Sequence, residues 1–210
     1  AKVGMLPPKL AQIIINIIKP SPENIILDPF CGTGVILQES LLMGLKAYGS
    51  DLEPRMIAYS QANLDWFTQT SYYNQVCGGE KPKSSIKLEV ADATSHQWSA
   101  FDAIACETYL GRAFSALPKP DVLEKVIQDV DTIHKKFLKN VAEQTKPGFK
   151  MCIAVPAWKV SNAFRHLPTL DHLEELGYTR AVFKRASNED LIYHREGQIV
   201  GRELVILIRN

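Results

Sequence analysis

The chain has 210 residues, with 24 lysines and arginines against 23 aspartates and glutamates. This length suffices for one sizeable α/β domain with a buried core. The net charge of +1 excludes a molecule-wide attraction to nucleic acid, so any site for a polyanion has to be a local patch.

Hydrophobic periodicity divides the chain into alternating helices and strands. In chain order we expect a helix from about residue 8, a strand over 24–29, a helix over 33–43, a strand over 46–50, a helix over 54–67, a polar connection over 68–85, and strands over 86–90 and 101–106. The remainder predicts a helix over 121–143, a strand over 151–155, a helix through Leu170, Leu173 and Leu176, and closing strands over 181–184 and 203–208.

Strands that alternate with helices form a mostly parallel sheet. The last two strands have no helix between them, which predicts an antiparallel hairpin. We therefore expect an α/β fold of the Rossmann-like type, with seven strands, a mostly parallel sheet and a C-terminal antiparallel hairpin. This is the architecture of class I S-adenosylmethionine (SAM)-dependent methyltransferases.

The opening helix is expected to bury one apolar side, made of Leu10, Ile13, Ile14, Ile17 and Ile18. No apolar run reaches membrane-spanning length, and the first residues lack a signal-peptide pattern. The four cysteines, at positions 31, 77, 106 and 152, lack metal-ligand spacing. We expect reduced thiols in a cytoplasmic protein with no membrane contact and no metal site.

The most informative stretch is 25–34, an apolar strand that ends in Asp28 and continues into a turn with Gly32 and Gly34. Ligands of doubly wound sheets lie at the carboxyl ends of the strands, and glycines let the backbone approach a ligand closely. The pattern lacks the third glycine of the dinucleotide fingerprint. A carboxylate at the strand tip disfavours a phosphate and favours an ammonium group.

Four motifs resemble the catalytic domain of THUMP-associated RNA methylases, a family that includes tRNA guanosine N2-methyltransferases. They are LPPKLA at 6–11, DPFCGTG at 28–34, GSDLEP at 49–54 and QIVGRE at 198–203. The resemblance spans nearly the whole chain in the right order. The family usually carries an RNA-binding THUMP region before this domain. We expect residues 1–210 to be the catalytic domain, with that region absent or removed.

The resemblance implies a SAM site built from three acids at successive strand ends. Asp28 would contact the methionine ammonium, Asp51 both ribose hydroxyls, and Asp92 the adenine amino group. The implied cofactor-binding set is Asp28, Phe30, Gly32, Gly34, Asp51, Leu52, Asp92 and Ala93. A single acid at a strand end is more often a helix cap, but three beside a glycine turn favour cofactor binding.

The catalytic segment departs from the family pattern. Amino-methylating enzymes of this kind carry Asp or Asn, two prolines, and Tyr or Phe after the fourth strand. Here the segment is ETYLG at 107–111, without either proline. Glu107 would accept hydrogen bonds from the target amine, and Tyr109 would stack on the extruded base. A shifted working site, a degenerate site, and a glutamate that merely caps a loop remain open.

Other aromatic and basic residues are weaker candidates. Tyr72 and Tyr73, with Lys81 and Lys83, have the chemistry to stack bases and contact phosphate, but a solvated loop is the simpler interpretation. Three further candidates have two interpretations each. Arg112 and Phe114 could line a nucleotide pocket or lie on the surface. Trp158 could form a wall of the base pocket or belong to the core, and His134 is expected to be structural or to lie on the surface.

The sequence therefore predicts SAM-dependent methylation of an exocyclic amine of a nucleobase, with guanine N2 in tRNA as the expected target. The expected partners are tRNA or another structured RNA, with an RNA-binding module or partner subunit that supplies affinity. Two alternatives stay open. A DNA adenine-N6 or cytosine-N4 methyltransferase would use the same cofactor motifs. A SAM-binding, catalytically inert RNA-binding subunit would fit the loss of the prolines.

Overall fold

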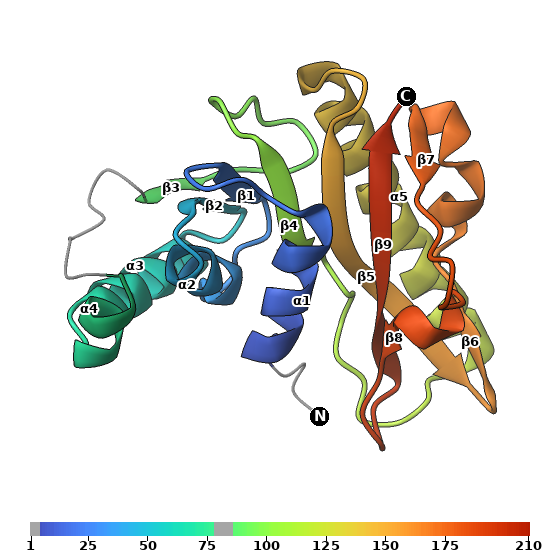
Figure 1. The fold of residues 1–210 in the computed structure, drawn as a ribbon. Helices are drawn as coiled ribbons and strands as arrows, with labels where there is room; N and C mark the ends of the chain where they lie inside the picture. The colour runs from blue at the N-terminus through green and yellow to red at the C-terminus, as the bar shows by residue number, and fades with distance from the viewer. Residues whose placement is uncertain (1–4, 78–85) are drawn as a thin grey trace. The chain divides into compact units, whose positions relative to one another are not determined.

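The structure is a computed structural model of the 210-residue chain, and it describes residues 5–77 and 86–210. The backbone divides into two compact units (Figure 1). We call them the N-terminal unit (Met5–Cys106) and the C-terminal unit (Glu107–Asn210).

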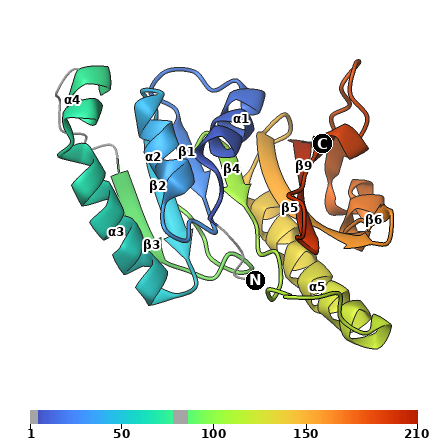
Figure 2. The same ribbon diagram turned by 90° about the horizontal axis from the view of Figure 1, so that it is seen from below.

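The N-terminal unit is a parallel sheet with helices packed on one face (Figures 1 and 2). Its strands lie in the order β3-β2-β1-β4, and each neighbouring pair is parallel. Prolines occupy the first turn of α1 and of α3, where a missing amide hydrogen costs nothing. The elements in chain order are α1 (Pro8–Ile18), β1 (Ile25–Asp28), α2 (Val35–Leu42), β2 (Lys46–Asp51), α3 (Pro54–Thr68), α4 (Ser71–Cys77), β3 (Ile86–Val90) and β4 (Ala103–Glu107).

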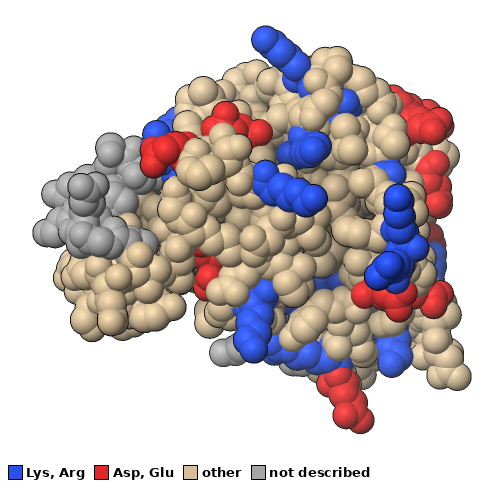
Figure 3. Space-filling model, in the orientation of Figure 1, with Lys and Arg blue, Asp and Glu red and all other residues tan. Residues whose placement is uncertain are grey.

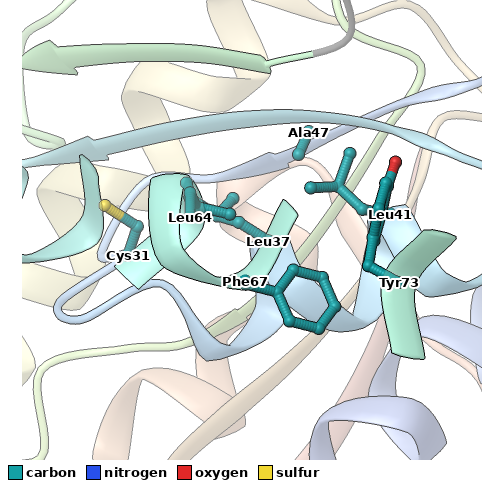
Figure 4. Packing of buried hydrophobic residues seen from close by; sticks show 7 residues of the cluster. All are labelled: Cys31, Leu37, Leu41, Ala47, Leu64, Phe67 and Tyr73. Atoms are coloured by element: carbon teal, nitrogen blue, oxygen red, sulfur yellow. The ribbon is translucent and has the colours of Figure 1, made fainter. Parts of the chain in front are cut away.

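A buried apolar cluster joins the helices to this sheet (Figure 4). Its members are Cys31, Leu37, Leu41, Ala47, Leu64, Phe67 and Tyr73. Gly49 on β2 gives this layer its close packing, because a Cβ at that position would lie 2.5 Å from Leu37 Cδ1 and 2.9 Å from Leu88 Cδ2. The helix α2 therefore lies close against the strand that carries Asp51.

The C-terminal unit is an antiparallel sheet around the long strand β9, with α5 as its main helix. β9 lies between β5 and β7, while β6 pairs with β5 and β8 with β9. The elements in chain order are α5 (Pro120–Gln144), β5 (Lys150–Val160), β6 (Ala163–Arg165), η1 (Pro168–His172), η2 (Glu174–Leu176), β7 (Tyr178–Arg180), η3 (Glu189–Leu191), β8 (Ile192–Tyr193) and β9 (Val200–Arg209).

Most predicted elements are present, and α1, α2, α3, α5 and the first five strands lie within a few residues of their expected positions. The prediction of a loop over 68–85 was wrong for its first part, because α4 buries Tyr73 against Phe67 at 5.3 Å between ring centroids. The rest of that stretch, 78–85, lies outside the described residues. The prediction for α1 was wrong at Ile13, which is exposed.

Two predictions for the C-terminal unit need correction. The expected helix through Leu170 to Leu176 is a pair of short 3₁₀ helices, η1 and η2. The expected strand over 181–184 lies earlier, as β7, because its ladder with β9 pairs Tyr178 with Arg209 and ends at Arg180. Val182 is 83% exposed, so the apolar run there does not mark a buried strand. The two-residue β8 and three-residue β6 were not predicted.

Candidate functional site

Three aspartates lie at the carboxyl ends of neighbouring parallel strands in the N-terminal unit. Asp28 ends β1 and pairs with Gly49 of β2, and Asp51 ends β2 and pairs with Val90 of β3. Asp92 follows two residues after the end of β3. Because β1 and β3 flank β2, the fold brings the three predicted acids to one edge of this sheet.

Asp51 holds the glycine turn that follows β1. Its Oδ2 accepts a hydrogen bond from the Gly32 amide at 2.9 Å, and its Oδ1 accepts one from the Glu53 amide at 2.9 Å. The Cys31 amide also donates to the Ser50 carbonyl at 2.9 Å. A carboxylate has about four acceptor positions, so Asp51 retains capacity for two further donors such as the hydroxyls of a ribose.

Gly32 and Gly34 have φ angles of +52° and +87°, in the left-handed region that glycine adopts without strain. A Cβ on Gly34 would lie 3.1 Å from Ser60 Oγ, and that hydroxyl donates to the Gly32 carbonyl at 2.8 Å. The turn is therefore packed tightly on its inner side by α3. Among the described residues, a Cβ on Gly32 would meet only the Phe30 carbonyl, at 3.9 Å, so these residues leave room beside Gly32.

The other two acids differ in exposure. Asp28 is 2% exposed, and its Oδ1 accepts a hydrogen bond from the Phe30 amide at 3.0 Å. A buried carboxylate favours a cationic or hydrogen-bonding partner because an isolated buried charge is costly. Asp92 is exposed, and its Oδ1 accepts from the Thr94 amide and hydroxyl at 2.8 and 2.7 Å. Leu52, 63% exposed, and the buried Ala93 flank Asp51 and Asp92 along the chain.

These residues fit the cofactor that the sequence predicts. The buried Asp28 suits an ammonium group, and Asp51 suits a pair of hydroxyls. The described residues leave room for an atom the size of a Cβ beside Gly32, where a ligand would contact the main chain. The two glycines hold the turn in a conformation that other residues rarely adopt. The residues present therefore fit an amino-acid group joined to a nucleoside.

Glu107, the predicted catalytic acceptor, forms an ion pair within the C-terminal unit. Its Oε2 accepts a short hydrogen bond from Nε of Arg202, which lies on β9. The Arg202 side chain is 3% exposed and that of Glu107 is 20% exposed. A carboxylate has about four acceptor positions, so Glu107 retains capacity for a further donor from a ligand.

Burial raises the pKa of Glu107, although the Arg202 guanidinium acts in the opposite direction. Burial therefore disfavours the charged form of this carboxylate, whereas the arginine stabilises that form. A group with this environment at the end of a strand is a candidate functional residue on physical grounds.

Tyr109 is 45% exposed and lies between two buried residues, Thr108 and Leu110. This alternation turns the Tyr109 ring outward, as stacking on a base requires. The Thr108 hydroxyl lies 2.7 Å from Nε2 of His134, a buried residue of α5. Sequence reasoning noted His134 only as a structural or surface residue and did not expect this contact.

Several weaker candidates are now placed. Arg112 lies over the Phe114 ring, 5.0 Å from its centroid, so these residues contact each other. Trp158 is fully buried in β5, which supports the core interpretation. Tyr73 is also core, and Tyr72 is exposed on α4. Lys81 and Lys83 lie outside the described residues.

Arg202 is the main site residue that sequence reasoning missed as a partner. The motif at 198–203 was noted, but nothing in it predicts that the arginine reaches across to Glu107, 95 residues away. Within the described ranges, no cluster of His, Cys, Asp and Glu side chains has the arrangement of a metal site. No helix among residues 5–77 and 86–210 is long and apolar enough to cross a bilayer.

A parallel sheet with acids at successive strand ends beside a glycine turn, and an antiparallel sheet at the C-terminus, define the class I methyltransferase fold. The solved structure of TrmN from Thermus thermophilus superimposes on 100% of this chain and 51% of its own length, with a TM-score of 0.63 at 17% identity. At that identity the likeness shows the fold. The sequence of residues 1–167 matches the family described as RMKL-like, methyltransferase domain, and the chain belongs to it.

Two curated relatives are tRNA (guanine(10)-N2)-dimethyltransferases. The protein of Methanothermobacter thermautotrophicus is 41% identical over 153 residues, which cover 73% of this chain and 39% of the relative. The protein of Pyrococcus abyssi is 31% identical over 136 residues, which cover 65% of this chain and 35% of that relative. The chain thus spans well under half the length of either relative.

Proposed function

We propose that this chain is the catalytic domain of a SAM-dependent methyltransferase that methylates guanine N2 in tRNA. The observation that carries the proposal is the row of three aspartates at successive strand ends beside the Gly32–Gly34 turn. Membership of the methyltransferase-domain family and the names of the two curated relatives support it. A tRNA substrate is consistent with a cytoplasmic location.

The N-terminal unit would hold the cofactor, which supplies a methyl group on a sulfonium. Asp28 would bind the methionine ammonium, and Asp51 both ribose hydroxyls through its remaining acceptor positions. Asp92 would accept from the adenine amino group through Oδ2. Phe30, Gly32, Gly34, Leu52 and Ala93 would line the same site through main-chain and apolar contacts.

In the C-terminal unit, Glu107 and Tyr109 would bind the nucleobase. Glu107 would accept a hydrogen bond from the exocyclic amine through Oε1 while Arg202 holds Oε2. This contact orients the lone pair of the amine for attack and does not need to remove a proton first. Tyr109 would stack on a base extruded from its RNA helix.

Affinity for tRNA would come mainly from outside this domain. On the face drawn in Figure 3, lysines and arginines are scattered among acids and uncharged residues. The formal net charge is +1, so the electrostatic attraction to phosphates is weak. An additional RNA-binding module or subunit is therefore part of the proposal.

The test combines calorimetry with SAM and a methylation assay with labelled SAM on unmodified total tRNA. Double-stranded DNA in the same assay tests the DNA alternative, and nucleoside analysis of the product identifies the modified base. We expect SAM binding and label in N2-methylated guanosine. Absence of SAM binding to the folded protein would overturn the methyltransferase proposal.

One observation favours the inert-subunit alternative: the segment after β4 has no proline, and its glutamate is paired with a buried arginine. If SAM binds but no nucleic acid is methylated, even with an added RNA-binding partner, this alternative is supported.

A further inference from the structure

We propose that Thr108 and His134 are positioning residues, which hold the Glu107–Tyr109 segment in a working conformation in place of the prolines that this chain lacks. The inference rests on the proposed function and deepens it. It explains how a segment without prolines keeps a defined backbone.

The hydrogen-bond pattern around His134 determines which atom donates. Nδ1 of His134 lies 2.8 Å from the carbonyl of Val130, and a carbonyl can only accept, so Nδ1 carries a hydrogen. Burial lowers the pKa of His134 to about 4, so the imidazole is neutral near pH 7. Its Nε2 is therefore an acceptor. The Thr108 hydroxyl lies 2.7 Å from this nitrogen and 3.1 Å from the Ala154 carbonyl, and it directs its one hydrogen to Nε2, the nearer acceptor, which has no other donor in this arrangement.

Thr108 is also held through its main chain. Its amide donates to the Ala154 carbonyl on β5 at 3.0 Å. A proline at this position has no amide hydrogen and would lose that bond. Thr108 is therefore bound to β5 through its backbone amide and to α5 through its side chain. Both partners, Ala154 and His134, are buried.

The other end of the segment lies on the same stretch of α5. Gly111 has a φ of +83°, and a Cβ there would lie 3.1 Å from Val130 Cγ2 and 3.3 Å from Val126 Cγ1. Val130 is also the residue whose carbonyl binds His134. Residues 126–134 of α5, a little over two helical turns, therefore contact both Thr108 and Gly111, and the exposed Tyr109 lies between these two residues in the sequence.

Removal of the Thr108 hydroxyl should have a defined structural effect. In Thr108→Val the side chain keeps its shape, but Nε2 of His134 becomes a buried acceptor without a donor. The backbone between Glu107 and Tyr109 then keeps its amide hydrogen bond to β5 but loses its hydrogen bond to α5, so it can shift away from α5. A displacement near 1 Å at a reacting group costs up to about a hundredfold in rate.

The experiment compares Thr108→Val and Thr108→Ser with Thr169→Val in the full chain. Thr169 is a matched control because its hydroxyl is also buried, in the same unit, and donates to Asp131 Oδ1 at 2.6 Å. We expect Thr108→Val to lower kcat on tRNA by about tenfold to a hundredfold, with little change in the KM for tRNA or the KM for SAM. Thr108→Ser should stay near wild type, and Thr169→Val should lose stability without a comparable loss of kcat.

Two measurements do not depend on activity. Amide hydrogen exchange of residues 107–111 should become faster in Thr108→Val and not in Thr169→Val. Nitrogen-15 spectra of the histidines in the wild-type protein should show His134 with its hydrogen on Nδ1. Unchanged kcat and exchange in Thr108→Val, or a hydrogen on Nε2, would overturn the inference. A wild type that methylates nothing but shows the expected exchange would count against the proposed function alone.

Discussion

The two functional segments of this protein are held by different kinds of contact. The turn at 28–34 takes its shape from backbone geometry, with Gly32 and Gly34 at positive φ angles, and nearby residues of β2 and α3 bind its main chain, among them Asp51 and Ser60. The segment at 107–111 depends on side chains from distant parts of the chain, Arg202 on β9 and His134 on α5. A site held by backbone geometry leaves a recognisable motif, whereas a site held by remote side chains can change its residues and keep its shape.

The largest expected effect is at the segment held by side chains. Glu107→Ala should lower turnover on tRNA by about a hundredfold or more, because the amine loses the acceptor that orients it. SAM affinity should stay within a few fold, since the predicted cofactor contacts lie in the N-terminal unit. Single-turnover methylation and calorimetry measure the two quantities.

Two variants sharpen this result. Glu107→Gln keeps an acceptor oxygen and should recover much of the lost rate. Glu124→Ala removes another glutamate that pairs with an arginine of the same unit, but its side chain is 49% exposed, so we expect almost no change. Near wild-type turnover in Glu107→Ala would remove Glu107 from the catalytic assignment.

At the turn, Asp51→Ala should weaken SAM binding by about 1.5–3 kcal/mol, or roughly tenfold to 150-fold in Kd, by removing charge-assisted hydrogen bonds to the ribose. Calorimetry with SAM tests this. Asp65→Ala on the exposed side of α3 is the control, and it should leave the Kd unchanged. Equal affinities for all three proteins would contradict the assigned role of Asp51.

A backbone substitution tests how closely the strand beneath the turn is packed. Gly49→Ala should destabilise the fold by about 2 kcal/mol, because its Cβ would overlap Leu37. Gly44→Ala is the matched control, since nothing lies within 4 Å of its Cβ and only its φ of +73° opposes the change. We expect it to cost about 1 kcal/mol. Urea unfolding of both variants gives the comparison, and a larger loss at Gly44 would contradict it.

The last prediction concerns the effect of acid on His134. Its pKa is lowered from 6.5 to about 4 by burial, although Asp131 nearby acts in the opposite direction. Below pH 6.5 the unfolded chain therefore takes up a proton that the folded protein does not. Stability from this group is complete above pH 6.5 and is lost as the pH falls toward 4, by at most about 1.4 kcal/mol per pH unit.

The measurement is urea unfolding at pH 7 and pH 5 for the wild type and for His134→Gln. The wild type should lose more stability between the two pH values than the variant does, because the variant has no imidazole to protonate. An equal loss in both proteins would show that His134 is not the group responsible.

The sequence was a good guide where a feature is local. The strand before Asp28, the glycine turn and the long helix α5 follow from apolar periodicity and from glycine and proline positions, which act within a few residues. The same reasoning failed at α4, because the polar residues around the buried Tyr73 suggested a loop. It also failed near β7, because apolar residues such as Val182 suggested a strand although they are exposed. In both places the decisive interaction is with another element.

The sequence by itself determined the fold class, because the alternation of strands and helices follows from local patterns that repeat along the chain. The three candidate acids came from strand ends together with the family resemblance, and their role stays a prediction. The pairing of Glu107 with Arg202, the contact of Thr108 with His134 and the outward position of Tyr109 were decided only by the tertiary structure. Those contacts join residues that are 95 and 26 positions apart. No local pattern encodes such a distance, and only the packing of β9 and α5 brings these side chains to the segment.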